Sequence, residues 1–240
     1  MSRRQLKLRA KAQIRGNVFI LFLIEMISNI DLWIHAIVGS TGIIGSMFAI
    51  IIEAGLSGSV DISVSQQFNK LSEAFAGYGI AFLILHYIIG SPLAISLSRT
   101  YLDLSEERKP KFARLGYGFK TCWEQSVLLQ ILKSVFIFLW SLLFIIPGII
   151  KNYSYSMANY IMAENPDIDA LEAITKSKNM MRGNKFSLFI LHISFFFWYL
   201  LIPITLGLVL IYIKPYVQAA NMNFYLNIKK SEEEEELKEA

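Results

Sequence analysis

Among the ionisable side chains that lie inside apolar stretches of the chain, four are singled out: Glu25, His86, Lys133 and His192. A charged group in hydrocarbon is energetically unfavourable, so each of these residues is a candidate functional group. Pairing a carboxylate such as Glu25 with an ammonium such as Lys133 would offset part of that cost, and imidazoles that titrate near neutral pH can carry protons. The four residues therefore predict either an ion or proton pathway or, more simply, polar contacts between packed helices.

A second group of candidates consists of basic side chains next to the apolar stretches, where they would meet anionic lipid headgroups. These residues are Arg15, Arg99, Lys109, Arg114, Lys178 and Arg182. In the same belt, Asp103 and Glu106 would form the acid–base pair of a lipid enzyme. A solvated loop whose charges pair with one another is the simpler interpretation, so the belt predicts headgroup contact rather than catalysis.

Motifs with sharper chemistry are absent from the sequence. It contains no phosphate-binding Gly-Lys-Ser loop, no His-Glu-x-x-His and no Gly-x-Ser-x-Gly. The single cysteine, Cys122, cannot form an intrachain disulfide, and no Cys/His cluster has the spacing of a zinc site. We therefore expect no enzymatic activity, no cofactor and no metal site.

The composition is typical of a chain in contact with lipid. Of the 240 residues, 54% are hydrophobic and only 18% are charged, and the mean hydropathy is +0.45. Globular domains carry about 25% charged residues. The sequence thus predicts one integral membrane domain over residues 1–230, followed by an acidic, disordered tail at 231–240. The net charge of +4 is placed beside apolar runs, which favours lipid rather than nucleic acid as its partner.

Long apolar runs predict an all-α, polytopic bundle of about six transmembrane helices. These runs are 17–39, 77–97, 126–146, 148–163, 186–207 and 208–227. Most of the 23 Lys and Arg residues lie in four segments between or beyond the runs, so the positive-inside rule places those segments and both termini in the cytoplasm. The shorter run 41–56 then has no crossing to make and is expected to be re-entrant or interfacial on the outer side.

Amphipathic surface helices are expected to position the basic residues on the cytoplasmic side. Residues 2–15 place Leu6, Ala10 and Ile14 on one face, and 166–182 should begin at Asn165–Pro166 and bury Leu171, Ile174 and Met181. Both helices end in the same way, at Arg15-Gly16-Asn17 and Arg182-Gly183-Asn184. This repetition indicates units of surface helix plus membrane hairpin, with a third, less visible unit in the middle.

The pair Pro147-Gly148 closes the run 126–146 and predicts a break in the helix. A hairpin tip between two spans is the simpler explanation. A broken helix that lines a cavity is the alternative.

Several of these segments resemble one family. They include Lys11 to Asn17, Ser96-Leu97-Ser98-Arg99-Thr100-Tyr101, Leu139 to Lys151, Tyr153 to Ala158, Ser177 to Gly183, and Pro215-Tyr216 to Phe224-Tyr225. Together they resemble the DUF975 family of bacterial integral membrane proteins, a domain of unknown function, from about Leu6 to Leu226. The resemblance implies a multi-pass helical bundle in the bacterial cell membrane and implies no particular activity.

Three functions remain open on the sequence. The first is a non-enzymatic membrane module that binds lipids or a protein partner through its basic surface helices. The second is a transporter of small solutes or ions that uses the buried His, Glu and Lys residues. The third, a membrane-embedded lipid enzyme, is the least favoured because no convergent cluster of acids, bases or metal ligands is visible. Convergence of Glu25, His86, Lys133 and His192 on one hydrated cavity would favour transport over the module.

Overall fold

The computed structural model describes residues 2–29 and 82–239, and every regular element within them is a helix. The all-α class is therefore confirmed for this part of the chain. The chain divides into two compact units, one of residues 1–28 and 91–240 and the other of residues 29–90. The described part of the smaller unit ends in a π-helical turn, η1 (His86–Gly90).

Within residues 2–29 and 82–239, two helices are long and apolar enough to cross a membrane, Phe82–Ser105 and Trp123–Leu143. They fall on the predicted runs 77–97 and 126–146. Only 11% of the apolar window in Trp123–Leu143 is buried, against 44% in Phe82–Ser105, and a buried core helix passes the same test of length and composition. The other four predicted spans stay predictions, and run 41–56 lies outside the described residues.

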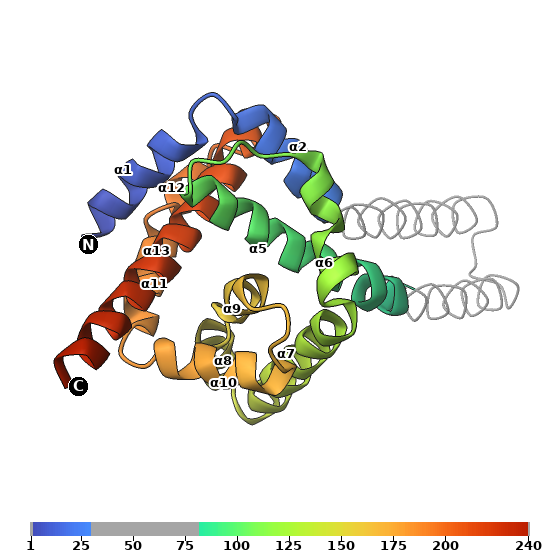
Figure 1. The fold of residues 1–240 in the computed structure, drawn as a ribbon. Helices are drawn as coiled ribbons and strands as arrows, with labels where there is room; N and C mark the ends of the chain where they lie inside the picture. The colour runs from blue at the N-terminus through green and yellow to red at the C-terminus, as the bar shows by residue number, and fades with distance from the viewer. Residues whose placement is uncertain (1, 30–81, 240) are drawn as a thin grey trace, which may run out of the picture. The chain divides into compact units, whose positions relative to one another are not determined.

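The first surface helix, α1 (Arg3–Ile14), starts at a capping box. The Ser2 hydroxyl accepts a hydrogen bond from the Gln5 backbone N–H at 3.3 Å, and the Gln5 side chain accepts one from the Ser2 N–H at 2.8 Å. Leu6, Ala10 and Ile14 are all buried, so the predicted apolar stripe is confirmed. The helix packs along the C-terminal helix, α13 (Leu210–Glu239), as Figure 1 shows.

The turn after α1 depends on a glycine. Gly16 has a φ of +84°, and the Asn17 N–H donates to the Ile14 carbonyl at 2.9 Å. This is the arrangement of a type II turn, in which the third residue needs a positive φ and is therefore usually glycine. The next helix, α2 (Val18–Ser28), begins directly after the turn.

The same turn recurs between α10 (Ala170–Met180) and α11 (Lys185–Ile193). Gly183 has a φ of +79°, and the Asn184 N–H donates to the Met181 carbonyl at 3.2 Å. Equivalent positions of the two copies are also buried alike, namely Ala10 with Ser177, Ile14 with Met181, Leu21 with Leu188 and Ile24 with Leu191. The first and third units therefore share backbone conformation as well as sequence.

The start of α10 differs from the prediction. Asn165 ends the preceding helix, α9 (Ala158–Glu164), and α10 begins only at Ala170. The Asp169 N-cap makes no side-chain hydrogen bond, and the Ala170 N–H instead donates to Gln125 at 3.0 Å. Leu171 is also exposed, so the buried side of α10 is formed by the stripe Ala170, Ala173, Ile174, Ser177 and Met180.

The break near Pro147 also differs from the prediction. It falls at Phe144, whose extended backbone (φ −161°, ψ 150°) separates α7 (Trp123–Leu143) from α8 (Ile145–Ser154). Pro147 lies in the first turn of α8, where its missing N–H is tolerated. Gly148 permits close helix packing, because a Cβ there would lie 2.0 Å from the Ser141 Oγ. The α7–α8 hairpin is therefore present, but its break lies at Phe144, and Pro147 and Gly148 lie inside the second helix, near its start.

The remaining helices complete one core. Helix α9 is almost entirely buried and lies between α5 (Ser91–Ser105) and α10 (Figure 1). After α11 the chain continues through the short α12 (Phe196–Tyr199) into α13. The acidic tail differs from the disordered segment expected for it, because α13 continues as a helix to Glu239, where glutamate's helix propensity and a Lys230–Glu234 ion pair at 3.7 Å support it.

Candidate functional site

Glu25 on α2 is buried, with 3% of its surface exposed, and its carboxylate accepts a hydrogen bond from the Tyr101 hydroxyl on α5. The ammonium of Lys214 on α13 also acts on it electrostatically. The pairing of Glu25 with Lys133 considered from the sequence is not found. Glu25 thus joins α2 to α5.

Lys133 and His192 also contact polar side chains of neighbouring helices. The Lys133 ammonium on α7 donates to Asn159 Oδ1 on α9 at 3.0 Å. His192 on α11 contacts Asn221 Oδ1 on α13 through Nε2 at 2.8 Å, and its Nδ1 lies 3.3 Å from the Tyr153 hydroxyl. A neutral imidazole with its proton on Nε2 satisfies both contacts of His192.

The three ionisable groups share one arrangement, and each bonds to a different partner. Each lies four residues after a fully buried leucine (Leu21, Leu129 or Leu188) and bonds to a polar side chain of a neighbouring helix. Across residues 2–29 and 82–239, no hydrogen bond or ion pair joins one of the three to another. The arrangement is that of interhelical polar contacts rather than of a shared pathway.

His86 belongs to the smaller unit. Its ring stacks against Phe82 with centroids 6.0 Å apart and meets the edge of Tyr87 at 5.4 Å. The structure places it in the π-helical turn η1.

Asp103 is the centre of a charge cluster. It is 3% exposed, and its Oδ1 lies 3.2 Å from Arg99 Nε and 3.3 Å from Arg108 Nη1. Its Oδ2 lies 2.5 Å from Arg114 Nε, and Glu106 pairs with Arg108 at 2.6 Å. Because guanidinium groups hold both carboxylate oxygens, Asp103 is better suited to fixing the loop after α5 than to exchanging protons with a substrate. Arg99 and Arg114 are likewise bound to Asp103 rather than free for lipid.

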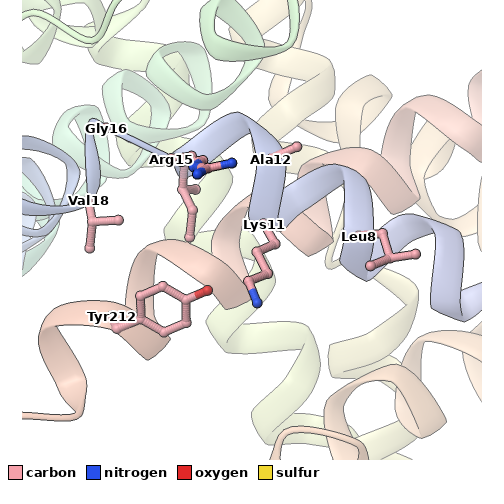
Figure 2. A pocket seen from close by; sticks show the side chains of 8 residues that line it. Leu8, Lys11, Ala12, Arg15, Gly16, Val18 and Tyr212 are labelled. Atoms are coloured by element: carbon pink, nitrogen blue, oxygen red, sulfur yellow. The ribbon is translucent and has the colours of Figure 1, made fainter.

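A basic pocket of about 580 Å³ lies at the turn between α1 and α2, facing α13. Its wall includes two cations, Lys11 and Arg15, and the Tyr212 side chain, and none of the described residues that line it is acidic. Figure 2 shows the Lys11 side chain and the Tyr212 hydroxyl directed toward each other across the pocket, with Leu8 and Val18 at opposite ends. The pocket thus combines hydrogen-bond donors for an anion with apolar walls.

Lys7, on the same helix, does not belong to this pocket. Its ammonium donates to the carbonyl of Ser194 at 3.3 Å and lies 4.5 Å from the centre of the Phe195 ring. Burial lowers the pKa of this ammonium from its ordinary value. Lys7 therefore anchors α1 at the C-terminal end of α11, where the helix dipole favours a cation.

A second pocket, of about 430 Å³, lies further along α1 and α13. Arg9 and Lys230 line it, but so does Glu234, which offsets their charge. Of the other predicted headgroup residues, Lys109, Lys178 and Arg182 are exposed. The first pocket is the better anion site because none of its described lining residues carries a carboxylate.

Sequence analysis missed several of these residues. Lys11 and Tyr212 line the pocket, and Asn159 and Asn221 are partners of the buried ionisable groups. The internal repeat could have identified Lys11, because it aligns Lys11 and Arg15 with Lys178 and Arg182, which the sequence had already marked as headgroup-binding candidates. The two asparagines could have been found as polar residues inside apolar runs.

In the described part of the chain, the fold and the site define a helical protein with two helices long and apolar enough to cross a membrane and a basic pocket bordered by apolar side chains. Residues 143–232 match the model of a family described as a protein of unknown function (DUF975), which confirms the family resemblance seen in the sequence. No curated protein and no solved structure matches the chain.

Proposed function

We propose that this protein is a multi-pass protein of the bacterial cell membrane, with both termini in the cytoplasm, and that it acts as a non-enzymatic module which binds anionic lipid headgroups. The pocket at Lys11, Arg15 and Tyr212 carries the proposal. Two cations and a hydroxyl suit the oxygens of a phosphate group, and charge-assisted hydrogen bonds are the stronger kind.

The apolar wall of the pocket supports a lipid over a soluble anion. Leu8 is 57% exposed, and Val18 stands at the entrance to the apolar helix α2. An amphiphile would place its phosphate at the cations and its chains along these side chains. Basic residues beside an anionic leaflet contribute roughly 1 kcal/mol each.

The competing functions have less support. A transporter would need Glu25, Lys133 and His192 near one pathway, but each forms a hydrogen bond to a different side chain of a neighbouring helix, namely Tyr101, Asn159 or Asn221. A lipid enzyme would need Asp103 or Glu106 available to a substrate, but arginines hold both residues.

The test is a titration of the full chain, purified in a non-ionic detergent, with short-chain phosphatidylglycerol and phosphatidylcholine. We expect tighter binding of phosphatidylglycerol, and we expect the double variant Lys11→Gln/Arg15→Gln to weaken it about tenfold or more, since two headgroup contacts are removed. The matched control is Arg3→Gln/Arg4→Gln, which removes two exposed cations of the same helix outside the pocket. Its affinity should stay within about twofold of the wild type.

Equal affinity of the wild-type chain for the two lipids would contradict the proposal. So would an equal loss in both double variants, because it would mean that overall charge, rather than the pocket, attracts the lipid.

A further inference from the structure

A second group of cations gathers around the repeated turn in the third unit. Lys178 and Arg182 occupy the positions that Lys11 and Arg15 have in the first unit, before a glycine with nearly the same φ. Two further lysines join them, Lys185 at the start of α11 and Lys151 on α8. Helices α10 and α11 both pack against α8, and the positive charges of Lys178 and Lys185 act on the Lys151 ammonium, so three helices bring like charges together.

These cations have no acidic partner in the described part of the chain. No ion pair involves Lys151, Lys178, Arg182 or Lys185, whereas the arginines around Asp103 are neutralised in part by its carboxylate. On α10 the ion pair is made by Lys176 and Glu172 instead. Gathering unpaired like charges destabilises a fold, so a bound anion would offset that repulsion.

Exposed hydrocarbon borders the same cations. The Lys151 ammonium lies 4.3 Å from the centre of the Trp140 ring, and Trp140 is 40% exposed. Ile149, Ile150 and Phe186, which neighbour Lys151 and Lys185 in the chain, are also exposed. A ligand that satisfies both surfaces must carry an anion next to apolar chains.

We propose that Lys151, Lys178, Arg182 and Lys185 form a second site for the phosphate of an anionic phospholipid, equivalent by internal repeat to the pocket at Lys11 and Arg15. This inference rests on the proposed function and extends it from one lipid site to two. The acyl chains lie against Trp140 and the apolar tip of the α7–α8 hairpin.

Trp140 supplies a local probe. The chain has three other tryptophans, so the variant Trp33→Phe/Trp123→Phe/Trp198→Phe keeps fluorescence at this site alone. The full chain is reconstituted in phosphatidylcholine vesicles that contain a minor fraction of either brominated phosphatidylglycerol or brominated phosphatidylcholine. Bromine quenches only nearby tryptophan, so the ratio of the two quenching efficiencies reports lipid selectivity at Trp140.

We expect quenching to favour phosphatidylglycerol by about threefold or more. The preference should disappear in Lys178→Gln/Lys185→Gln, which leaves Lys151 beside the probe. It should persist in Lys11→Gln/Arg15→Gln, whose cations lie at the other site, and in Lys109→Gln/Lys120→Gln, which removes two exposed cations elsewhere. Circular dichroism of each variant confirms that the helices are intact.

Equal quenching by the two lipids in the wild-type background would overturn the second site. If the first pocket still selects phosphatidylglycerol in the detergent titration, the proposed function survives that result; if selectivity is lost in both assays, both proposals fall. Soluble glycerol phosphate should leave the quenching ratio unchanged, and a ratio that it abolishes would assign the site to a free phosphate compound instead of a lipid. A loss in Lys109→Gln/Lys120→Gln equal to that in Lys178→Gln/Lys185→Gln would also contradict a local site.

Discussion

The buried hydrogen bond between Tyr101 and Glu25 illustrates how single residues hold the helices of this protein together. Both residues are nearly fully buried, and they lie on different helices. A buried polar group that loses its partner destabilises the fold by more than the bond itself contributes. The same reasoning applies to Lys133 with Asn159 and to His192 with Asn221.

We predict that Tyr101→Phe lowers the free energy of unfolding by about 1–3 kcal/mol, because the Glu25 carboxylate loses a donor inside the core. Tyr155→Phe is the matched control, since Tyr155 is also buried but makes no hydrogen bond through its hydroxyl in the described structure. Denaturant titration of the full chain in mixed micelles measures both. An equal change in the free energy of unfolding in the two variants would mean that the hydrogen bond of the Tyr101 hydroxyl does not stabilise the fold.

At Asp103 we predict a larger loss of stability than at Tyr101. Asp103→Asn leaves three arginines around a neutral group and should lower stability by about 3 kcal/mol, as breaking a buried ion pair does. Glu106→Gln removes an exposed partner of Arg108 and should change stability by at most about 1 kcal/mol. The same denaturant titration measures the stability of both variants. If the Asp103→Asn protein were as stable as the Glu106→Gln protein, the charge cluster would not have the structural role assigned to it.

At the scale of elements, glycines decide where helices can touch and where they can turn. Gly118 of α6 (Tyr117–Thr121) packs on α5, where an added Cβ would lie 2.1 Å from the Pro92 carbonyl oxygen, and its N–H donates to Ser96 Oγ at 2.8 Å. Gly16 has open space around it but a positive φ. The two positions therefore require glycine for different reasons, one for contact and one for backbone conformation.

This difference predicts how strongly alanine at each glycine position lowers the melting temperature. Gly118→Ala forces α5 and α6 apart and should lower the melting temperature well beyond Gly16→Ala, which adds only about 1 kcal/mol of backbone strain. Gly116→Ala is the control, because a Cβ there meets only the end of the Lys120 side chain, at 3.8 Å. Thermal unfolding followed by circular dichroism gives the order, and a Gly118→Ala protein as stable as the control would show that the contact is not tight.

For the whole molecule, the prediction concerns topology. Single cysteines at Ser2 and Lys109 should react with a membrane-impermeant maleimide from the cytoplasmic side, and one at Gln66, outside the described residues, should react from the opposite side. The native Cys122 is buried, and burial raises the pKa of its thiol, so its own reaction should be slow. As a control, the labelling is repeated in a Cys122→Ala background, in which the native thiol is absent. Equal accessibility of Gln66→Cys and Lys109→Cys from one face would overturn the multi-pass arrangement.

The sequence by itself determined the helical class, the apolar stripe of α1 and the repeated Arg-Gly-Asn turn, because periodicity and a required positive φ are local properties of the chain. It also contained the family resemblance confirmed over residues 143–232. The start of α10 could not be read locally, since Gln125, distant in sequence, accepts the bond from its first N–H.

Only the tertiary structure decided which charges are free and which are bound. Arg99 and Arg15 look alike in the sequence, yet one is held by Asp103 and the other lines an open pocket. The structure also separated Glu25, Lys133 and His192, which the sequence could have grouped in one pathway. Electrostatic partners are chosen by distance in space, and the fold sets that distance.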